Sequence, residues 1–466
     1  MPPKLTITTV TTSLGFLLVQ LDVSIVNVAL ASIGTGIHTG VSGLQWVVDS
    51  YALTFAALLL SAGAVGDRAG ARRAFIGGLL LFSAASLGCA LAPNAAALIV
   101  ARAVQGAGAS TLVPCSLALL NRACRDDAVA RARAVSLWTA AGSIGLALGP
   151  VLGGALVTAF GWRSIFLVNL PIGAAGVWLA RRFVDEASTH AGGIDPAGQL
   201  LAILSLFCLT GAVIEAGVLG WSSPFVWAGL ALAALGFCTF IRVEYRGAQP
   251  MLPLAFFRNP TFAAATMVGF LLNLALYGAV FVLGLYFQQV DRWSPLRSGM
   301  ALLPFAVAIF VANVASGRLA AIATPRVIVT GGLLVAALGI WSLRTIDPAT
   351  RYDAILPGLI LLPFGIGLAV PAMTSSLLAT VPRPRAGVAS GVLNAVRQAG
   401  GAIGVALFGA LMAHAGSGIA HAFAAGSVML GMAAMVAAGF IGTGRLAMLR
   451  AHGTEPWLTQ KEGCSQ

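Results

Sequence analysis

Long apolar stretches separated by short polar segments dominate the sequence. A hydrocarbon core about 30 Å thick needs about 20 apolar residues per helix, and hydrophobic residues make up 58% of the 466 residues while charged residues make up only 9%. The stretches lack the apolar-polar alternation of membrane-barrel strands. The sequence therefore predicts an all-α integral membrane protein with fourteen transmembrane helices. The predicted spans are approximately 7–31, 44–66, 74–92, 96–120, 134–159, 164–183, 198–219, 225–243, 262–287, 298–319, 326–344, 354–380, 386–413 and 421–442.

The Lys and Arg residues are unevenly distributed between the two sides of the predicted membrane. If the spans alternate, twenty of the 27 lie on the side of the N-terminus, while Arg102 and Arg397 fall inside spans. Because basic loops mark the cytoplasmic side, we expect both termini to be cytoplasmic. The net charge of +12 then reflects topology, and nucleic acid is not an expected partner. The five basic residues on the opposite side are Arg163, Arg292, Arg297, Arg344 and Arg351.

Two internal similarities recur at nearly the same offset. GSIGLAL at 142–148 returns as GAIGVAL at 401–407, and IGGLLLF at 76–82 returns as TGGLLVA at 330–336. Parallel repeats of this kind are typical of transporters, and this pairing leaves two spans between two six-helix halves. The predicted division is an N-terminal half (1–183), a cytoplasmic linker (184–197), an inserted helix pair (198–243), a C-terminal half (244–442) and a cytoplasmic tail (443–466).

One predicted span carries the segment SIGLALGPVLGGAL, residues 143–156, which is rich in helix-breaking residues. Small residues at helical spacing allow another helix to approach to backbone contact in lipid, and a proline frees one backbone hydrogen bond. We expect this segment to form a close-packed, bendable seam between the two halves on the outer side. Its residues are Gly145, Gly149, Pro150, Gly153 and Gly154.

A second motif, GAVGDRAGARRAF at 63–75, lies between the second and third predicted spans. It places an acid among arginines at the membrane edge, with a glycine that allows a tight reversal. We expect a charge latch in a cytoplasmic loop that pairs in one conformation and opens in the other. The latch residues are Asp67, Arg68, Gly70, Arg72 and Arg73.

These two motifs and a third, LIVARAVQGAGAS at 98–110, resemble three signatures of the major facilitator superfamily. The segments LDVSIVNVAL (21–30), QWVVDSYAL (45–53) and GWRSIFLVNLPIG (161–173) are similar to the fourteen-span drug/proton antiporters of that superfamily. The resemblance implies the major facilitator fold, with two six-helix halves plus two inserted central helices. It also implies a multidrug exporter of the bacterial inner membrane, and we expect a monomer.

The sequence departs from the family pattern in two places. Ala71 stands where the loop signature has a basic residue, and the equivalent loop of the second half, SGRLAAIATPRVIV, has no acid. We therefore expect an asymmetric latch.

Charged residues inside spans are the strongest functional candidates, because each is costly in hydrocarbon. Asp22, Asp49 and Glu215 lie in the outer halves of their predicted spans. The resemblance strengthens Asp22 and Asp49 as the acids of proton coupling and cation attraction, with the two roles left unassigned between them. Arg102 also resembles a buried arginine that takes part in proton coupling in this family. Glu215 is explained equally well as a carboxylate that reaches the membrane interface from a helix end.

Further candidates carry alternative structural explanations. Arg397 is interpreted either as the counterpart of Arg102 in the second half or as a residue with a purely structural role. Polar and aromatic side chains near the acids could contact a cationic drug, although aromatic residues also serve as packing and interface anchors. These further candidates are Gln20, Asn27, Trp46 and Tyr51.

The function predicted from these observations is proton-coupled efflux of lipophilic, cationic small molecules by alternating access. A partly dry cavity disfavours the charged form of a carboxylate. A proton and a substrate cation can then compete for the same carboxylate. The proton gradient supplies the energy, and no cofactor is expected.

Other functions fit the sequence less well. The alternative within transport is a narrow exporter of one self-made metabolite, antibiotic or siderophore, and the glycine-rich motif disfavours an uptake symporter. A membrane enzyme or receptor would need a catalytic or metal cluster or a large soluble domain. No catalytic set is evident, and the six cysteines and five histidines show no metal-ligand spacing.

Overall fold

The computed structural model describes residues 3–124, 128–186, 195–247, 252–347, 350–382, 385–412 and 418–442, and none of these lies in a strand. Thirteen helical segments of this part are long and apolar enough to cross a membrane. The second helix, α2 (Val41–Ala69), is a further 29-residue helix within the bundle. The predicted all-α membrane fold is therefore confirmed, and the predicted tail 443–466 lies outside the described residues.

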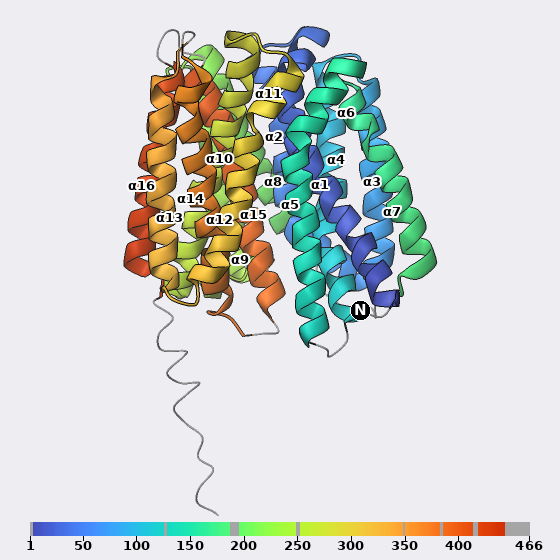
Figure 1. Cartoon of the computed structure of the whole chain (residues 1–466). Coiled ribbons are helices and arrows are strands. Elements are labelled where there is room, and N and C mark those ends of the chain that lie inside the picture. Colours follow the sequence, from blue (N-terminus) through green and yellow to red (C-terminus); the bar gives the residue numbers. More distant parts are fainter. Residues whose placement is uncertain are drawn as a thin grey trace, which may run out of the picture.

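The first seven helices gather on one side of the bundle, coloured blue to green in Figure 1. Within this group α1 packs on α5, α2 on α4, and α3 on both α4 and α7. Short helix α6 and helix α7 together form the span predicted at 164–183. The remaining bounds of the group are α1 (Pro3–Gly36), α3 (Ala71–Leu91), α4 (Ala95–Ala123), α5 (Ala128–Phe160), α6 (Ser164–Leu167) and α7 (Asn169–Phe183).

The helices from α10 onward gather on the other side, in yellow to red (Figure 1). Here α10 packs on α15 and α16, and α14 packs on α12 and α13. The bounds are α10 (Pro260–Leu285), α11 (Pro295–Ala301), α12 (Leu303–Leu319), α13 (Pro325–Ser342), α14 (Tyr352–Leu378), α15 (Ala386–Met412) and α16 (Gly418–Phe440), with single turns η1 (Leu254–Arg258), η2 (Tyr286–Val290) and η3 (Leu343–Thr345).

Helices α8 (Pro196–Leu219) and α9 (Pro224–Arg246) pack on each other, and α8 also contacts α2 and α15. The pair is thus attached to both groups through α8. Gln199 strengthens this attachment, since its amide donates to the carbonyl of Ala57 on α2 at 2.7 Å and its oxygen accepts from the hydroxyl of Ser61.

A second predicted span, besides that at 164–183, is divided in two. The stretch predicted at 298–319 forms α11 and α12, which meet at Leu302. Pro304 lies in the first turn of α12, and a proline has no N–H to donate to the preceding turn. The helix therefore ends and begins again at this position.

The internal repeat recurs in the packing. Gly145 of α5 lies so close to α1 that an added Cβ would stand 2.6 Å from the carbonyl oxygen of Leu17, and Gly404 of α15 meets the carbonyl of Leu274 on α10 in the same way. Both glycines occupy equivalent positions of the repeated segments. This correspondence supports the predicted kinship of the two halves, whose boundaries stay a prediction.

The glycine-rich segment of α5 has two faces, which corrects the expected seam. Gly145, Gly149 and Gly153 pack against α1, a helix of the same group, whereas only Pro150 and Gly154 face the other group. Helical spacing explains the division, since residues 145, 149 and 153 share one stripe and residues 150 and 154 share the next. The stripe therefore holds α1 and α5 together, and a smaller contact reaches across the bundle.

That smaller contact joins α5 to α11. An added Cβ on Gly154 would stand 2.6 Å from the carbonyl oxygen of Pro295, and one on Gly299 would meet the carbonyl of Pro150. A second link joins α2 to α15, where the Gln45 amide donates to the carbonyls of Val405 and Ala406 at 3.2 and 2.8 Å. The α5–α11 link lies toward the end of the bundle opposite the N-terminus, where α11 is labelled in Figure 1. Gln45 lies near the start of α2, which follows the far end of α1.

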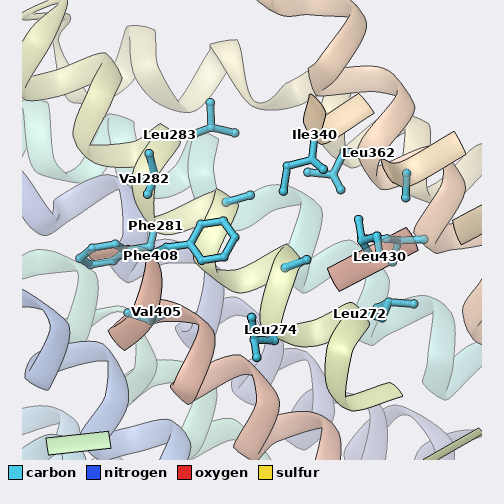
Figure 2. Packing of buried hydrophobic residues seen from close by; sticks show 14 of the residues in the cluster. Leu272, Leu274, Phe281, Val282, Leu283, Ile340, Leu362, Val405, Phe408 and Leu430 are labelled. Carbon is cyan, nitrogen blue, oxygen red and sulfur yellow. The ribbon is translucent and has the colours of Figure 1, made fainter. Parts of the chain in front are cut away.

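The largest apolar core cluster extends over both groups, from Ile25 of α1 and Phe166 of α6 to buried residues of α10, α14, α15 and α16. Phe408 of α15 packs against Gly278 of α10 and Gly426 of α16, and Figure 2 shows its ring among Val405, Phe281 and other buried side chains of the cluster. Small residues on the facing helices let these aromatic rings lie between the helices.

Replacing Gly145 by alanine should destabilise the protein. The added methyl group would collide with backbone of α1, and overpacking of this kind costs about 1–3 kcal/mol. We expect a lower melting temperature for Gly145→Ala in detergent. Gly77→Ala is the matched control, since nothing lies within 4 Å of a Cβ at that helical glycine. Equal melting temperatures for the two variants would contradict the proposed backbone contact.

Candidate functional site

A buried ion pair joins α1 to α4. Asp22 Oδ2 accepts a hydrogen bond from Arg102 Nη1 at 2.5 Å. The two residues expose 0% and 1% of their surface. An ion pair at this depth is tolerated only if the remaining polar atoms find partners.

The other carboxylate oxygen of Asp22 is held by two amides. Asp22 Oδ1 accepts hydrogen bonds from Gln105 Nε2 at 2.8 Å and from Asn169 Nδ2 at 3.0 Å. Both amides also donate to the hydroxyl of Ser86, at 2.8 and 3.2 Å. The network thus connects α1, α3, α4 and α7, and it satisfies the Asp22 carboxylate.

Arg102 extends the network to α2. Its Nε donates to the carbonyl oxygen of Val47 at 3.1 Å, and its Nη1 also donates to Gln105 Oε1 at 2.6 Å. The guanidinium carbon lies 4.3 Å from the centre of the Tyr51 ring, within the range of a cation–π interaction. The arginine is therefore fixed on several sides.

Asp49 of α2 has a different environment. It exposes 0% of its surface, and neither carboxylate oxygen has a hydrogen-bond partner among the described residues. It lines a cavity of about 20 Å³ between the two groups of helices, together with Asn27, Tyr51, Tyr277 and Gln398. Such a volume holds about one water molecule.

The other predicted residues of this region lie at different places. Asn27 and Tyr51 line the cavity, while Trp46 of α2 is not a lining residue and stacks on Phe207 of α8, with ring centres 6.1 Å apart. Gln20 is half-buried and does not contribute to the cavity lining. Glu215 is also half-buried, on α8, away from that lining.

The predicted latch is built differently from the expectation. Helix α2 continues through Asp67 and Arg68, so that no loop is present and Gly70 alone separates α2 from α3. Gly70 has φ +93°, a backbone conformation that favours glycine. The side chain of Asp67 lies outside the described part of the structure.

Glu186, which follows α7, is an acid that contacts this cluster, while the role of Asp67 stays a prediction. Its Oε1 accepts a hydrogen bond from the backbone N–H of Arg72 at 3.0 Å, and its Oε2 lies 3.6 Å from Arg73 Nε. The carboxylate also benefits from its position at the N-terminus of α3. Nearby, a hydrogen bond from Lys4 lowers the pKa of the exposed Asp185 carboxyl.

Several residues of the site were missed from the sequence. Gln105 and Asn169 lie within the quoted segments LIVARAVQGAGAS and GWRSIFLVNLPIG, so the motifs themselves contained a signal. Tyr277, Gln398 and Glu186 had no such signal, because each becomes adjacent to the site only through helix packing. Among the described residues, no three His, Cys, Asp or Glu side chains come together as a metal site would require.

Comparison with known proteins shows the family of the chain. The model of the Major Facilitator Superfamily matches residues 12–405. A methylenomycin A resistance protein of Streptomyces coelicolor is 39% identical over 90% of this chain and 88% of its own length. The multidrug resistance protein Stp of Mycobacterium tuberculosis is 39% identical over 87% of this chain and 76% of its own length.

The fold agrees with solved structures. The crystal structure of a D-xylose-proton symporter superposes with a TM-score of 0.70, at 15% identity, over 94% of this chain and 98% of that chain. The chain therefore belongs to the major facilitator superfamily of membrane transporters. The predicted resemblance is confirmed, and drug-resistance proteins are among its relatives.

The ion pair predicts non-additive effects of substitution. Asp22→Asn and Arg102→Gln each leave a buried charge without its partner, which costs about 3–5 kcal/mol. The double variant removes both charges, so we expect it to lose less stability than the sum of the single variants. Melting temperatures in detergent measure this, with Glu215→Gln as an unshifted control. Additive losses would show that the pair contributes no coupling.

Proposed function

We propose that the chain is a proton-coupled exporter of antibiotics and lipophilic drugs that carry a cationic group. Its relatives include a methylenomycin A resistance protein and a multidrug resistance protein. In this proposal it works as a monomer in the bacterial inner membrane, with both termini cytoplasmic. It uses the proton gradient without a cofactor and performs no enzymatic reaction.

The observation that carries the proposal is the contrast between the two acids. Asp22 is fixed by Arg102, Gln105 and Asn169, whereas Asp49 is buried beside a cavity with no partner for either oxygen among the described residues. An ionised carboxylate in that position is costly unless it is paired. Asp49 therefore takes either a proton or a cationic group, and Asp22 serves as the fixed counterion of Arg102.

Competition at Asp49 yields antiport. A proton that enters from outside neutralises the carboxylate and releases the cationic cargo. After the cavity opens to the cytoplasm, loss of that proton restores the charge that attracts the next cargo molecule. Cargo and proton bind the same group in turn, so each transport cycle exchanges one for the other.

The contacts between the two groups of helices suit this cycle. With the N-terminus cytoplasmic, the Pro150–Gly299 contact and the Gln45 hydrogen bonds to α15 lie toward the outer side. They would hold the outer end closed while cargo enters from the cytoplasm. Opening toward the outside requires the α2–α15 and α5–α11 packing to separate at that end, while the α1–α5 packing can stay intact.

A narrow exporter of a single antibiotic is the second candidate. The name of the Streptomyces relative refers to resistance against one antibiotic. The exchange at Asp49 would operate in the same way for one cargo as for many. The breadth of transport separates the two functions.

Ethidium transport tests the proposal. In inside-out vesicles with an imposed pH gradient, the wild type should accumulate ethidium, and Asp49→Asn should lower the gradient-driven rate at least about tenfold, within the usual range of coupling effects. Glu215→Gln serves as the control, because that acid lies outside the cavity lining, and its rate should stay close to the wild type.

The outcomes separate the candidates. Gradient-driven accumulation that survives in Asp49→Asn would refute the assignment of Asp49. A folded wild type that moves no ethidium would remove the broad efflux function and leave the narrow exporter.

A further inference from the structure

Arg397 of α15 is a cation inside the membrane without an acid beside it in the described part of the chain. It lies near the middle of a 27-residue helix, half-buried. Its Nε donates to Asn273 Oδ1 on α10 at 3.4 Å. None of the described carboxylates lies within ion-pair distance of its guanidinium.

Arg102, the other arginine predicted inside a span, is a buried cation whose charge is balanced by several partners. Arg102 has a carboxylate at 2.5 Å, a glutamine oxygen at 2.6 Å and a backbone carbonyl at 3.1 Å. Arg397 has one weak bond to a neutral amide. A cation at such depth is costly without a partner, so its missing countercharge points to a ligand.

The position of Arg397 connects it to the central cavity. It precedes Gly401 by one helical turn, so both lie on the same face of α15, and Gly401 and Gln398 line the cavity. Gly269 of α10 leaves room for its aliphatic stem, since an added Cβ there would stand 3.0 Å from Arg397 Cγ. Arg397 thus lies one helical turn along α15 from a lining residue, although Arg397 and its α10 neighbours Gly269 and Asn273 do not line the cavity themselves.

Two charges without an ionic partner among the described residues therefore lie at the cavity and one helical turn from its lining, on opposite groups of helices. Asp49 comes from α2 and Arg397 from α15. We infer that the cargo is a zwitterion, whose cationic group binds at Asp49 and whose carboxylate, or a similar small anion, binds at Arg397. This inference rests on the proposed function and specifies its substrate class.

A purely anionic cargo does not fit the exchange. Protonation of Asp49 removes a negative charge and would strengthen the binding of an anion, so proton and anion would travel together. A cargo with a cationic end competes with the proton, as antiport requires, while its anionic end adds affinity through Arg397. Guanidinium groups bind carboxylates in a two-pronged geometry, which a neutral ester cannot accept with the same strength.

Two dyes that differ at one group test this inference. Rhodamine 110 carries a cationic ring system and a free carboxylate, and rhodamine 123 is its methyl ester. In inside-out vesicles with a pH gradient, wild-type protein should show a half-saturating concentration about tenfold lower for rhodamine 110 than for rhodamine 123, as expected for a charge-assisted hydrogen bond. In Arg397→Gln this ratio should fall to about one.

Arg397→Lys provides a variant that keeps the charge but loses the planar fork, and its ratio should lie between those of the wild type and Arg397→Gln. The wild-type ratio needs no variant, so the test holds even if Arg397→Gln fails to fold. A wild-type ratio near one, or a ratio that Arg397→Gln leaves unchanged, would overturn the inference while efflux itself stands. Failure of the folded wild type to move either dye would instead count against the proposed efflux function.

Discussion

The buried ion pair between Asp22 and Arg102 organises the first group of helices. Membrane helices gain little from apolar contact with each other, because lipid tails are equally apolar, so polar contacts and close packing decide which helices meet. Through Gln105, Asn169 and the carbonyl of Val47, the pair connects α1, α2, α4 and α7. The same network leaves Asp22 with few ways to change its partners, which separates it from the acid that faces the cavity.

Close backbone packing supplies the second constraint. The glycine stripe of α5 lets α1 approach to contact, and Gly404 does the same for α10 and α15. Each group of helices is thereby held by its own seam, while separate contacts at Gly154, Gly299 and Gln45 join the two groups. Such a division suits alternating access, in which groups of helices rock against each other around a central site.

The sequence predicted most of the fold and part of the site. Composition and apolar length determine the spans, so these were predicted closely, apart from the breaks at Val168 and at Leu302 before Pro304. The two acids could not be distinguished, because their similar depth does not tell which helix face meets Arg102. Glu186 could not be connected to α3, since nothing local links residues more than a hundred positions apart. The seam was misassigned because neighbouring stripes of one helix face different helices.

Infrared spectroscopy of the purified protein tests the central claim, that Asp49 carries the exchangeable proton while Asp22 stays ionised beside Arg102. The protonated carboxyl group has its own carbonyl absorption, distinct from that of the carboxylate. At neutral pH the account predicts this absorption in the wild type and in Asp22→Asn, and its loss in Asp49→Asn. If the absorption instead disappears in Asp22→Asn and persists in Asp49→Asn, the two acids have the opposite roles and the account is wrong.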